Sequence, residues 1–215
     1  LKYTMAFSCG TFADLQCSRW MLERVGFPGG QEGEENLSLY RYRGYGCPGP
    51  TRAVDKEGKV YDEKYLSFWY GNHGWTHQFR CKICADPTGE ATDISVADAW
   101  PGGGPTEEEW GGYSMFISRT PRGDALMQAA IDAAVVTVEV DDIKTLYDVQ
   151  PHQAVKKQGI NARLKAIEDS GSPGPVFHNM RLDQAQAQND QEFFDSNHEG
   201  TRVRIEKGVN RERLA

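Results

Sequence analysis

The alternation of apolar and polar residues divides the chain into strand-like and helix-like segments. A period of two with β-branched or aromatic residues indicates a strand, and an apolar face recurring roughly every three to four residues indicates a helix. These patterns predict strands at residues 3–8, 37–43, 93–97, 113–119 and 135–140, a hairpin at residues 51–61, and helices at residues 11–25, 123–134 and 153–168. The first strand is expected to be buried, and the last helix to be interrupted or joined at Gly159.

This order of elements indicates a mixed α/β (α+β) fold, with a mixed β-sheet core flanked by helices and joined by glycine-rich loops. We expect residues 1–170 to form this domain. Residues 171–215 are rich in Gln, Asn and Asp, which is typical of an extended arm or a disordered tail, and three Phe residues favour the arm. Because a strand follows Leu1 almost at once, we expect the domain to be incomplete at its N-terminus.

Composition narrows the class of protein. Of 215 residues, 39% are hydrophobic and 11% aromatic, which is enough for a packed core and excludes wholesale disorder. The formal net charge of −7 argues against nucleic acid or an anionic membrane as the main partner. No run of about 18 apolar residues predicts a membrane span, and nothing indicates secretion, so we expect a cytoplasmic protein.

Five cysteines, at positions 9, 17, 47, 81 and 84, are the first candidates for chemistry. Cys81 and Cys84 form a C-x-x-C pair, whose two thiols can face one metal centre or each other. Pro87 and Gly89 follow directly, which argues against the long helix of a thioredoxin-type site. There is no second C-x-x-C pair. Iron–sulfur ligation with cysteines from elsewhere in the chain, zinc binding, and structural or incidental thiols therefore remain as alternatives.

Two loops are candidate binding sites. Residues 41–49 join two arginines to a glycine-rich turn, where backbone N–H groups and a guanidinium can bind a phosphate. An ordinary tight turn with solvated arginines is the alternative. Asp93 and Asp98 bracket a short strand, and their carboxylates suit a ribose or a flavin edge, although such acids more often cap a loop. His73 and His77 are spaced by four, but Gly74 disfavours a helix there, so metal ligation by this pair is not favoured.

Several of these motifs, taken in order, resemble a known family. They are Cys81-x-x-Cys84-x-Asp86, Glu90-Ala91-x-Asp93-Ile94-Ser95-Val96-x-Asp98, Gly112-x-Ser114, Ile117-x-Arg119-Thr120-x-x-Gly123 and the turn Tyr42-Arg43-Gly44-x-Gly46-x-Pro48-Gly49. Together they resemble the C-terminal domain of the beta subunits of coenzyme F420 hydrogenase and dehydrogenase. Residues 150–164 are similar to the closing helix of that domain, so the resemblance runs from about residue 3 to 167.

The resemblance implies an iron–sulfur flavoprotein with FAD and a [4Fe–4S] cluster. It implies cluster ligation by Cys9, Cys81 and Cys84. The fourth cysteine of the family lies in an upstream glycine-proline-cysteine turn that is missing here, and Cys47 is the candidate substitute; Cys17, inside a predicted helix, is expected to be a packed thiol. The residues implied to bind the cofactor are Arg43, Gly44, Gly46, Gly49, Asp93 and Asp98. Ala97 departs from the family, which commonly has glycine there, and its methyl group would crowd a cofactor close to the backbone.

The implied function is that of an oxidoreductase or its redox subunit. It would pass electrons between a [4Fe–4S] cluster, FAD and an external donor or acceptor such as F420, ferredoxin, NAD(P)H or an organic substrate. A ferredoxin-like or hydrogenase/dehydrogenase-like partner and a homo- or hetero-oligomer are implied as well. No catalytic residue is assigned. The alternative is a non-catalytic or zinc-binding subunit of a larger assembly that keeps the fold.

Overall fold

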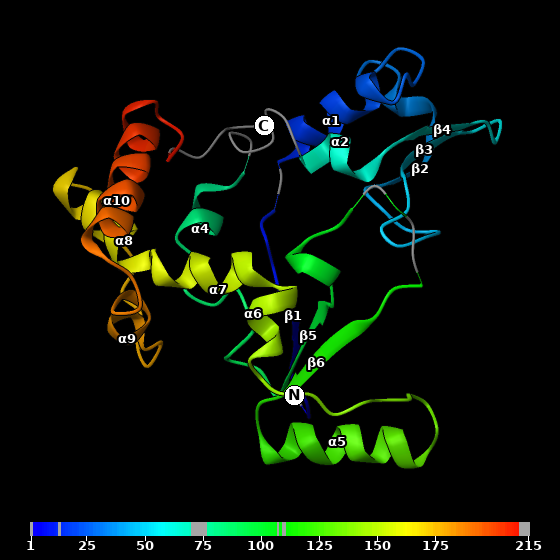
Figure 1. The fold of residues 1–215 in the computed structure, drawn as a ribbon. Helices are drawn as coiled ribbons and strands as arrows, with labels where there is room; N and C mark the ends of the chain where they lie inside the picture. Colours follow the sequence, from blue (N-terminus) through cyan, green and yellow to red (C-terminus); the bar gives the residue numbers. More distant parts are fainter. Residues whose placement is uncertain (1, 13, 70–76, 107, 109–110, 211–215) are drawn as a thin grey trace. The chain divides into compact units, whose positions relative to one another are not determined.

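The computed structural model describes residues 2–12, 14–69, 77–106, 108 and 111–210 (Figure 1). The chain divides into two compact units. The first unit comprises Leu1–Gly10, Phe79–Gly103 and Ser114–Ala215, and the second comprises Thr11–Gln78 and Gly104–Tyr113. Each unit contains a three-stranded sheet together with helices, so the expected mixed α/β class is confirmed, with the strands shared between two small sheets.

The sheet of the first unit has the order β1 (Met5–Phe7), β5 (Ile94–Asp98), β6 (Ser114–Ser118). Strand β1 runs parallel to β5, and β6 runs antiparallel to it. The central strand is the most buried of the three, and Ile94 is only 1% exposed. The predicted strands at residues 3–8, 93–97 and 113–119 are therefore confirmed as strands.

The expected burial of the first strand is wrong. Met5 and Phe7 are 62% and 69% exposed, although their sequence is apolar. Strand β1 lies at the edge of its sheet, where only one neighbour is hydrogen-bonded to it among the described residues. An apolar pattern shows that a segment could be buried, but it does not show whether other described residues cover it.

Helices make up most of the rest of the first unit. They are α4 (Phe79–Lys82), α5 (Pro121–Asp132), α6 (Thr145–Val149), α7 (Pro151–Gln158), α8 (Ile160–Asp169), α9 (Leu182–Gln186) and α10 (Gln191–Glu206), with a 3-10 turn η2 (Pro101–Gly103). The predicted helix at residues 123–134 is confirmed as α5. The predicted helix at residues 153–168 is confirmed as α7 and α8, which are interrupted at Gly159. None of the helices in the described part of the chain is long and apolar enough to cross a membrane.

The C-terminal segment is not an extended arm, because α9 and α10 form there. Asp190 begins α10 as its N-cap: its carboxylate accepts a hydrogen bond from the Phe193 amide at 2.9 Å. Helix α10 packs along α8 (Figure 1), and Thr201 on α10 is buried. Apolar residues of α8, among them Ile160 and Ile167, are almost fully buried. The division at residue 170 itself stays a prediction.

The strand predicted at residues 135–140 is also wrong. These residues form no strand, and Val140 is 99% exposed. A run of β-branched residues has the local preference for a strand, but a strand also needs a neighbour to pair with. The chain reverses after α5 with Ala134 in the left-handed region, at φ 54°, and no strand among the described residues pairs with the valines that follow.

The second unit contains a β-meander and a helix. Its elements are α1 (Leu15–Arg24), a 3-10 turn η1 (Glu34–Asn36), β2 (Leu37–Arg41), β3 (Thr51–Asp55), β4 (Val60–Glu63) and α2 (Tyr65–Trp69). The strands have the order β2-β3-β4, and both pairs are antiparallel. Leu22 of α1 packs with Phe27 and Ala53 to form the core. The hairpin predicted at residues 51–61 is confirmed: Gly58 adopts φ 86°, and the Asp55 carboxylate accepts from the Lys59 amide at 2.8 Å.

Candidate functional site

The two segments of the first unit that carry candidate cysteines are joined by a backbone hydrogen bond. Cys9 follows β1, Cys81 lies in α4, and Cys84 follows that helix. The Cys9 amide donates a hydrogen bond to the Pro87 carbonyl oxygen at 2.8 Å. The end of the first strand is thereby attached to the loop that follows the C-x-x-C pair, although the two segments are far apart in the sequence.

The loop after Cys84 is held by its own side chains and by β6. The Asp86 carboxylate accepts from the amides of Glu90 and Ala91 at 2.6 and 3.2 Å. Arg119, which follows β6, donates to the Thr88 carbonyl oxygen at 3.0 Å. Gly89 is needed here, because it adopts φ 69° and a Cβ would lie 2.8 Å from the Ala6 side chain on β1. The sequence thus builds an ordered loop behind the cysteine pair.

All three cysteines lie near one lysine. Burial lowers the pKa of Lys156 on α7, and the nearby thiols of Cys84, Cys9 and Cys81 act in the opposite direction. All three thiols therefore lie within electrostatic range of a single ammonium group. The sequence prediction grouped these cysteines, but it assigned no role to Lys156, whose place beside them depends on the packing of α7.

Further cations gather near the cysteine pair. Burial lowers the pKa of Lys82 to about 8, and the neighbouring Arg204, Arg163 and Lys156 add to the shift. Burial and the neighbouring Arg204 lower the pKa of Arg163 to about 10. Like charges are brought together here at an electrostatic cost. Such surroundings favour a negatively charged group, as thiolates or an iron–sulfur cluster would be.

The residue type of the three cysteines suits an iron–sulfur cluster, but the arrangement of their side chains does not form a metal site. Thiolates are the usual ligands of iron–sulfur clusters, and the surrounding cations would offset their charge. However, no group of three or more His, Cys, Asp or Glu side chains in the described residues is arranged to hold a metal ion. Cys47 belongs to the second unit, so its role as fourth ligand stays a prediction.

The remaining cysteine, Cys17, and the pair His73 and His77 are not among the implied cluster ligands. Cys17 is 4% exposed and packs with Met21, Tyr40 and Tyr42 in the second unit, in agreement with the expected packed thiol. His73 lies outside the described residues, so the pair that it forms with His77 stays untested.

Asp93 is fully engaged by protein groups. It is 3% exposed, and its carboxylate accepts from the Thr4 amide and hydroxyl, the Thr120 hydroxyl and the Arg122 guanidinium at 2.7–3.2 Å. The Arg122 guanidinium, followed by the Thr120 hydroxyl and the Thr4 amide, holds the pKa of this carboxyl well below its usual range. Its observed role is to join β1, β5 and α5, and a contact with a cofactor stays a prediction for Asp93. The same holds for Asp98, whose carbonyl oxygen accepts from Gln150 at 2.6 Å.

The glycine-rich turn of the second unit closes on itself. The Gly44 amide donates to the Pro48 carbonyl oxygen at 3.1 Å. Gly44, Gly46 and Gly49 all have positive φ, at 120°, 150° and 72°. A Cβ at Gly49 would lie only 2.3 Å from the Gly44 carbonyl oxygen. The turn therefore requires glycine for its shape, whether or not it binds a cofactor.

Two arginines flank this turn in different ways. The Arg41 guanidinium stacks over the Tyr45 ring at 3.8 Å. Its Nε and Nη2 atoms are buried and have no hydrogen-bond partner in the described part of the chain. Arg43 lies over the Tyr65 ring at 5.8 Å. Burying guanidinium nitrogens without partners is costly, and an anionic oxygen would relieve that cost. The sequence prediction chose Arg43, but Arg41 has the stronger claim to a phosphate.

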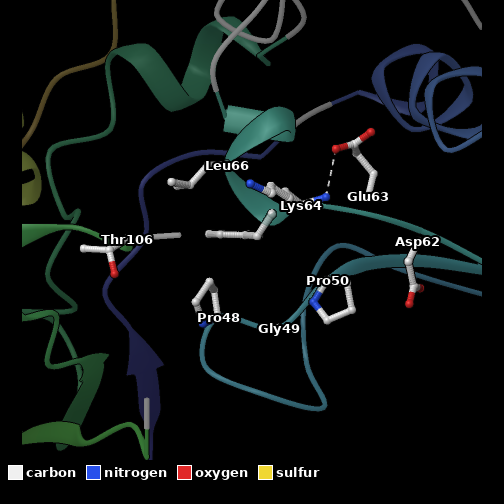
Figure 2. A pocket seen from close by; sticks show the side chains of 9 residues that line it. Pro48, Gly49, Pro50, Asp62, Glu63, Lys64, Leu66 and Thr106 are labelled. Atoms are coloured by element: carbon white, nitrogen blue, oxygen red, sulfur yellow. Dashed lines mark hydrogen bonds between the residues drawn. The ribbon is translucent and has the colours of Figure 1, made fainter. Parts of the chain in front are cut away.

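A pocket of about 330 Å³ opens beside the turn (Figure 2). Pro48, Gly49 and Pro50 of the turn line it together with Leu66 and Thr106, and the Lys64 amide donates to the Glu63 carboxylate at its rim. Tyr65, under Arg43, lines it as well. The volume is at the lower end of the range of small-molecule sites, about 300–1,000 Å³. It suits one ring system or one end of a larger ligand.

We expect Gly49→Ala to destabilise the protein by about 1–3 kcal/mol, because alanine combines a positive φ with the clash against Gly44. Urea unfolding, followed by the fluorescence of the tryptophans, measures the change. Gly58→Ala is the matched control, since Gly58 has φ 86° but nothing within 4 Å of a Cβ. Equal effects of the two substitutions would contradict the close approach within the turn.

Comparison with known proteins places these features in a family. Residues 2–144 match the family model that describes the C terminus of the coenzyme F420 hydrogenase/dehydrogenase beta subunit. A coenzyme F420 hydrogenase subunit beta from Methanothermobacter thermautotrophicus is 30% identical over 116 residues, which are 53% of this chain and 38% of that protein. The chain thus spans little more than a third of this curated relative. The family match ends at residue 144, before α6 to α10, so the expected likeness of residues 150–164 to the closing helix of the domain stays a prediction.

Proposed function

Because the chain belongs to the coenzyme F420 hydrogenase/dehydrogenase beta subunit family, we propose that it is a redox subunit that holds an iron–sulfur cluster and a flavin. A bound [4Fe–4S] cluster and FAD would supply one- and two-electron chemistry. The external donor or acceptor is proposed to be F420, ferredoxin, NAD(P)H or an organic substrate. A further redox protein or subunit would complete the assembly.

The observation that carries this proposal is the arrangement of the cysteines beside Lys156. Three thiols from two distant segments share one positively charged neighbourhood in the first unit. Packed thiols with no ligand do not by themselves account for several partly buried cations being gathered in the same place at an electrostatic cost. Anionic cluster ligands do, since the cations favour the thiolate form and offset the charge of the site. Cys9, Cys81 and Cys84 are the proposed ligands, with Cys47 as the candidate fourth.

The second unit is proposed to hold part of the flavin cofactor. The Gly44–Gly49 turn would bring backbone N–H groups close to a phosphate, and the unpartnered nitrogens of Arg41 would donate to its oxygens. The neighbouring pocket would accept a ring, with Tyr65 in its wall and Arg43 over the Tyr65 ring. A cation at this place would favour the anionic reduced form of a flavin.

The test is a measurement on the full chain purified under anaerobic conditions. We expect iron and acid-labile sulfide, extractable flavin, and a yellow-brown absorbance that is bleached by a chemical reductant. Zinc without iron would identify a zinc-binding subunit. A colourless protein that takes up neither iron nor flavin on reconstitution would identify a subunit that keeps the fold without the cofactors.

Arg43→Ala is expected to weaken flavin binding about tenfold, as expected for a lost interaction with a charged group. Titration of the metal-free protein with FAD, followed by flavin fluorescence, measures the affinity. Arg24→Ala, at an exposed position on α1 of the same unit, is the matched control. Unchanged affinity and an unchanged rate of flavin reduction in Arg43→Ala would remove Arg43 from the site.

A further inference from the structure

Helix α4 ends inside the C-x-x-C pair, and an arginine from a distant helix caps it. The last carbonyl groups of a helix have no partner within the helix. Lys82 is the last residue of α4, and its carbonyl oxygen accepts a hydrogen bond from Arg163 Nη1 at 2.6 Å. A helix of only four residues depends on such a contact more than a long one does. Arg163 on α8 therefore fixes the backbone between Cys81 and Cys84.

Arg163 is itself held in place by α10. Its Nε and Nη2 atoms donate to the Asn197 side-chain oxygen at 3.1 and 2.8 Å. The Asn197 amide nitrogen donates in turn to the Phe193 carbonyl oxygen at 2.9 Å, which sets the orientation of the amide. Asn197 approaches the chain closely at Gly159, where a Cβ would lie 2.5 Å from its oxygen. The guanidinium therefore uses two nitrogens to bind Asn197 and the third to bind Lys82.

Helix α7, which precedes α8 in the chain, contacts the other segments of the cysteine site. Lys156 donates to the Gly10 carbonyl oxygen at 3.0 Å, directly after Cys9. Lys157 binds both carboxylate oxygens of Glu90 at 2.6 and 2.7 Å, in the loop that follows Cys84. Each of these cations of α7 and α8 therefore attaches one segment that carries or follows a cysteine. All of them lie beyond residue 144, where the family match ends.

We propose that Arg163 is a positioning residue for the Cys81–Cys84 turn, and that α7, α8 and α10 brace the cysteine site from outside the family-matched residues. Arg163 acts through the Lys82 carbonyl, and Asn197 sets the direction of its guanidinium. The claim that these helices present the thiols to a cluster rests on the proposed function. The claim that Arg163 holds the turn in place does not depend on a cluster, so the two claims can be tested separately.

The first experiment is hydrogen exchange on the full chain without metal. In Arg163→Met, the amides of residues 79–84 are expected to exchange about tenfold faster or more, because a hydrogen bond from a charged group is lost. The amides of β5 are expected to exchange as in the wild type. Lys165→Met is the matched control on α8, since Lys165 is exposed and pairs with Asp169 rather than with the turn.

Asn197 provides a second route that leaves Arg163 in the protein. Asn197→Leu is expected to accelerate exchange at residues 79–84 as well, while Asn197→Asp, which keeps the oxygen acceptors, is expected to restore slow exchange. Unchanged exchange at residues 79–84 in both Arg163→Met and Asn197→Leu would overturn the proposal. Acceleration of β5 to the same extent would also overturn it, since the arginine would then stabilise the unit in general.

Iron uptake links the brace to the proposed function. After anaerobic reconstitution, at a temperature at which all the metal-free proteins are folded, Arg163→Met is expected to hold less iron per chain than the wild type and than Lys165→Met. If it retained full iron while its turn exchanged faster, the brace would have no role in presenting the thiols. If the wild type itself took up no iron, the proposed function would fail, and the exchange result would still decide the role of Arg163 in the turn.

Discussion

Cys81→Ser is expected to abolish iron binding by the full chain and to remove the iron-dependent part of its stability. A serine hydroxyl remains protonated at neutral pH and is a harder donor than a thiolate, so it replaces a soft cluster ligand poorly. Ligand sets from distant segments stabilise the folded protein when the metal binds. Cys9 and Cys81 come from such segments, joined through the contact between Cys9 and Pro87. Losing one ligand therefore affects both iron content and stability.

The measurement is iron per chain together with melting temperatures before and after reconstitution. We expect the metal-free wild type and Cys81→Ser to melt at similar temperatures, and only the wild type to gain stability on reconstitution. Cys17→Ala is the matched control, because Cys17 is buried against Met21 in the second unit and has no place in the site. Full iron content and a normal reduction rate in Cys81→Ser would contradict cluster ligation and leave zinc or structural thiols as the better interpretation.

Local patterns in the sequence predicted the elements whose partners are close by. The hairpin at residues 51–61 was predictable because Gly58 supplies the positive φ of the turn and the strands pair with each other. Helix α5 was predictable from its apolar face, and Thr120 caps it with a hydrogen bond from the Gly123 amide at 3.1 Å. In these cases the stabilising contacts lie within a few residues, where a pattern can indicate them.

The errors concern contacts over long distances. The valines at residues 135–140 have the preference for a strand, but no strand in the described part of the chain pairs with them. The polar composition of residues 171–215 concealed α10, whose stability comes from packing on α8. One local signal was present, since Asp190 is an N-cap before the two Phe residues at 193 and 194. An exposed first strand could not be distinguished from a buried one by its own sequence.

The residues of the candidate site also fall into those that a local motif predicts and those that only the packing of the helices reveals. Residue type and spacing selected Cys81 and Cys84, because a C-x-x-C pair is a local motif. Spacing could not select Lys156 or Arg163, since their proximity to the cysteines exists only after α7 and α8 have packed. Spacing also could not show that the Asp93 carboxylate already accepts hydrogen bonds from Thr4, just before β1, and from Arg122, at the start of α5.

Asp93→Ala is expected to cause the largest loss of stability among single polar substitutions in the first unit. The carboxylate is the common acceptor for the start of β1 at Thr4 and for the N-terminus of α5 at Thr120 and Arg122. Removing it leaves the partly buried Thr4 amide and the hydroxyls of Thr4 and Thr120 without their acceptor, which costs more than a lost surface pair, whereas the half-exposed Arg122 guanidinium can turn to water. We expect the melting temperature to fall by roughly 5–10 °C. Asp62→Ala, which breaks an exposed pair with Arg52, is the matched control and should have little effect.

The pH dependence of stability tests whether Asp93 acts as an anion. Its pKa in the folded protein is held below the usual value, which is about 3.9 in an unfolded chain. The folded state therefore binds the proton less readily than the unfolded state, and the contribution of Asp93 to stability is complete above the unfolded pKa. It is lost as the pH falls from about 5 toward the folded pKa. We expect the melting temperature of the wild type to fall more steeply than that of Asp93→Asn between about pH 7 and about pH 3, so that the gap between them narrows. Parallel curves would mean that the carboxylate charge adds nothing, and that Asp93 stabilises β1, β5 and α5 by the shape of its hydrogen bonds alone.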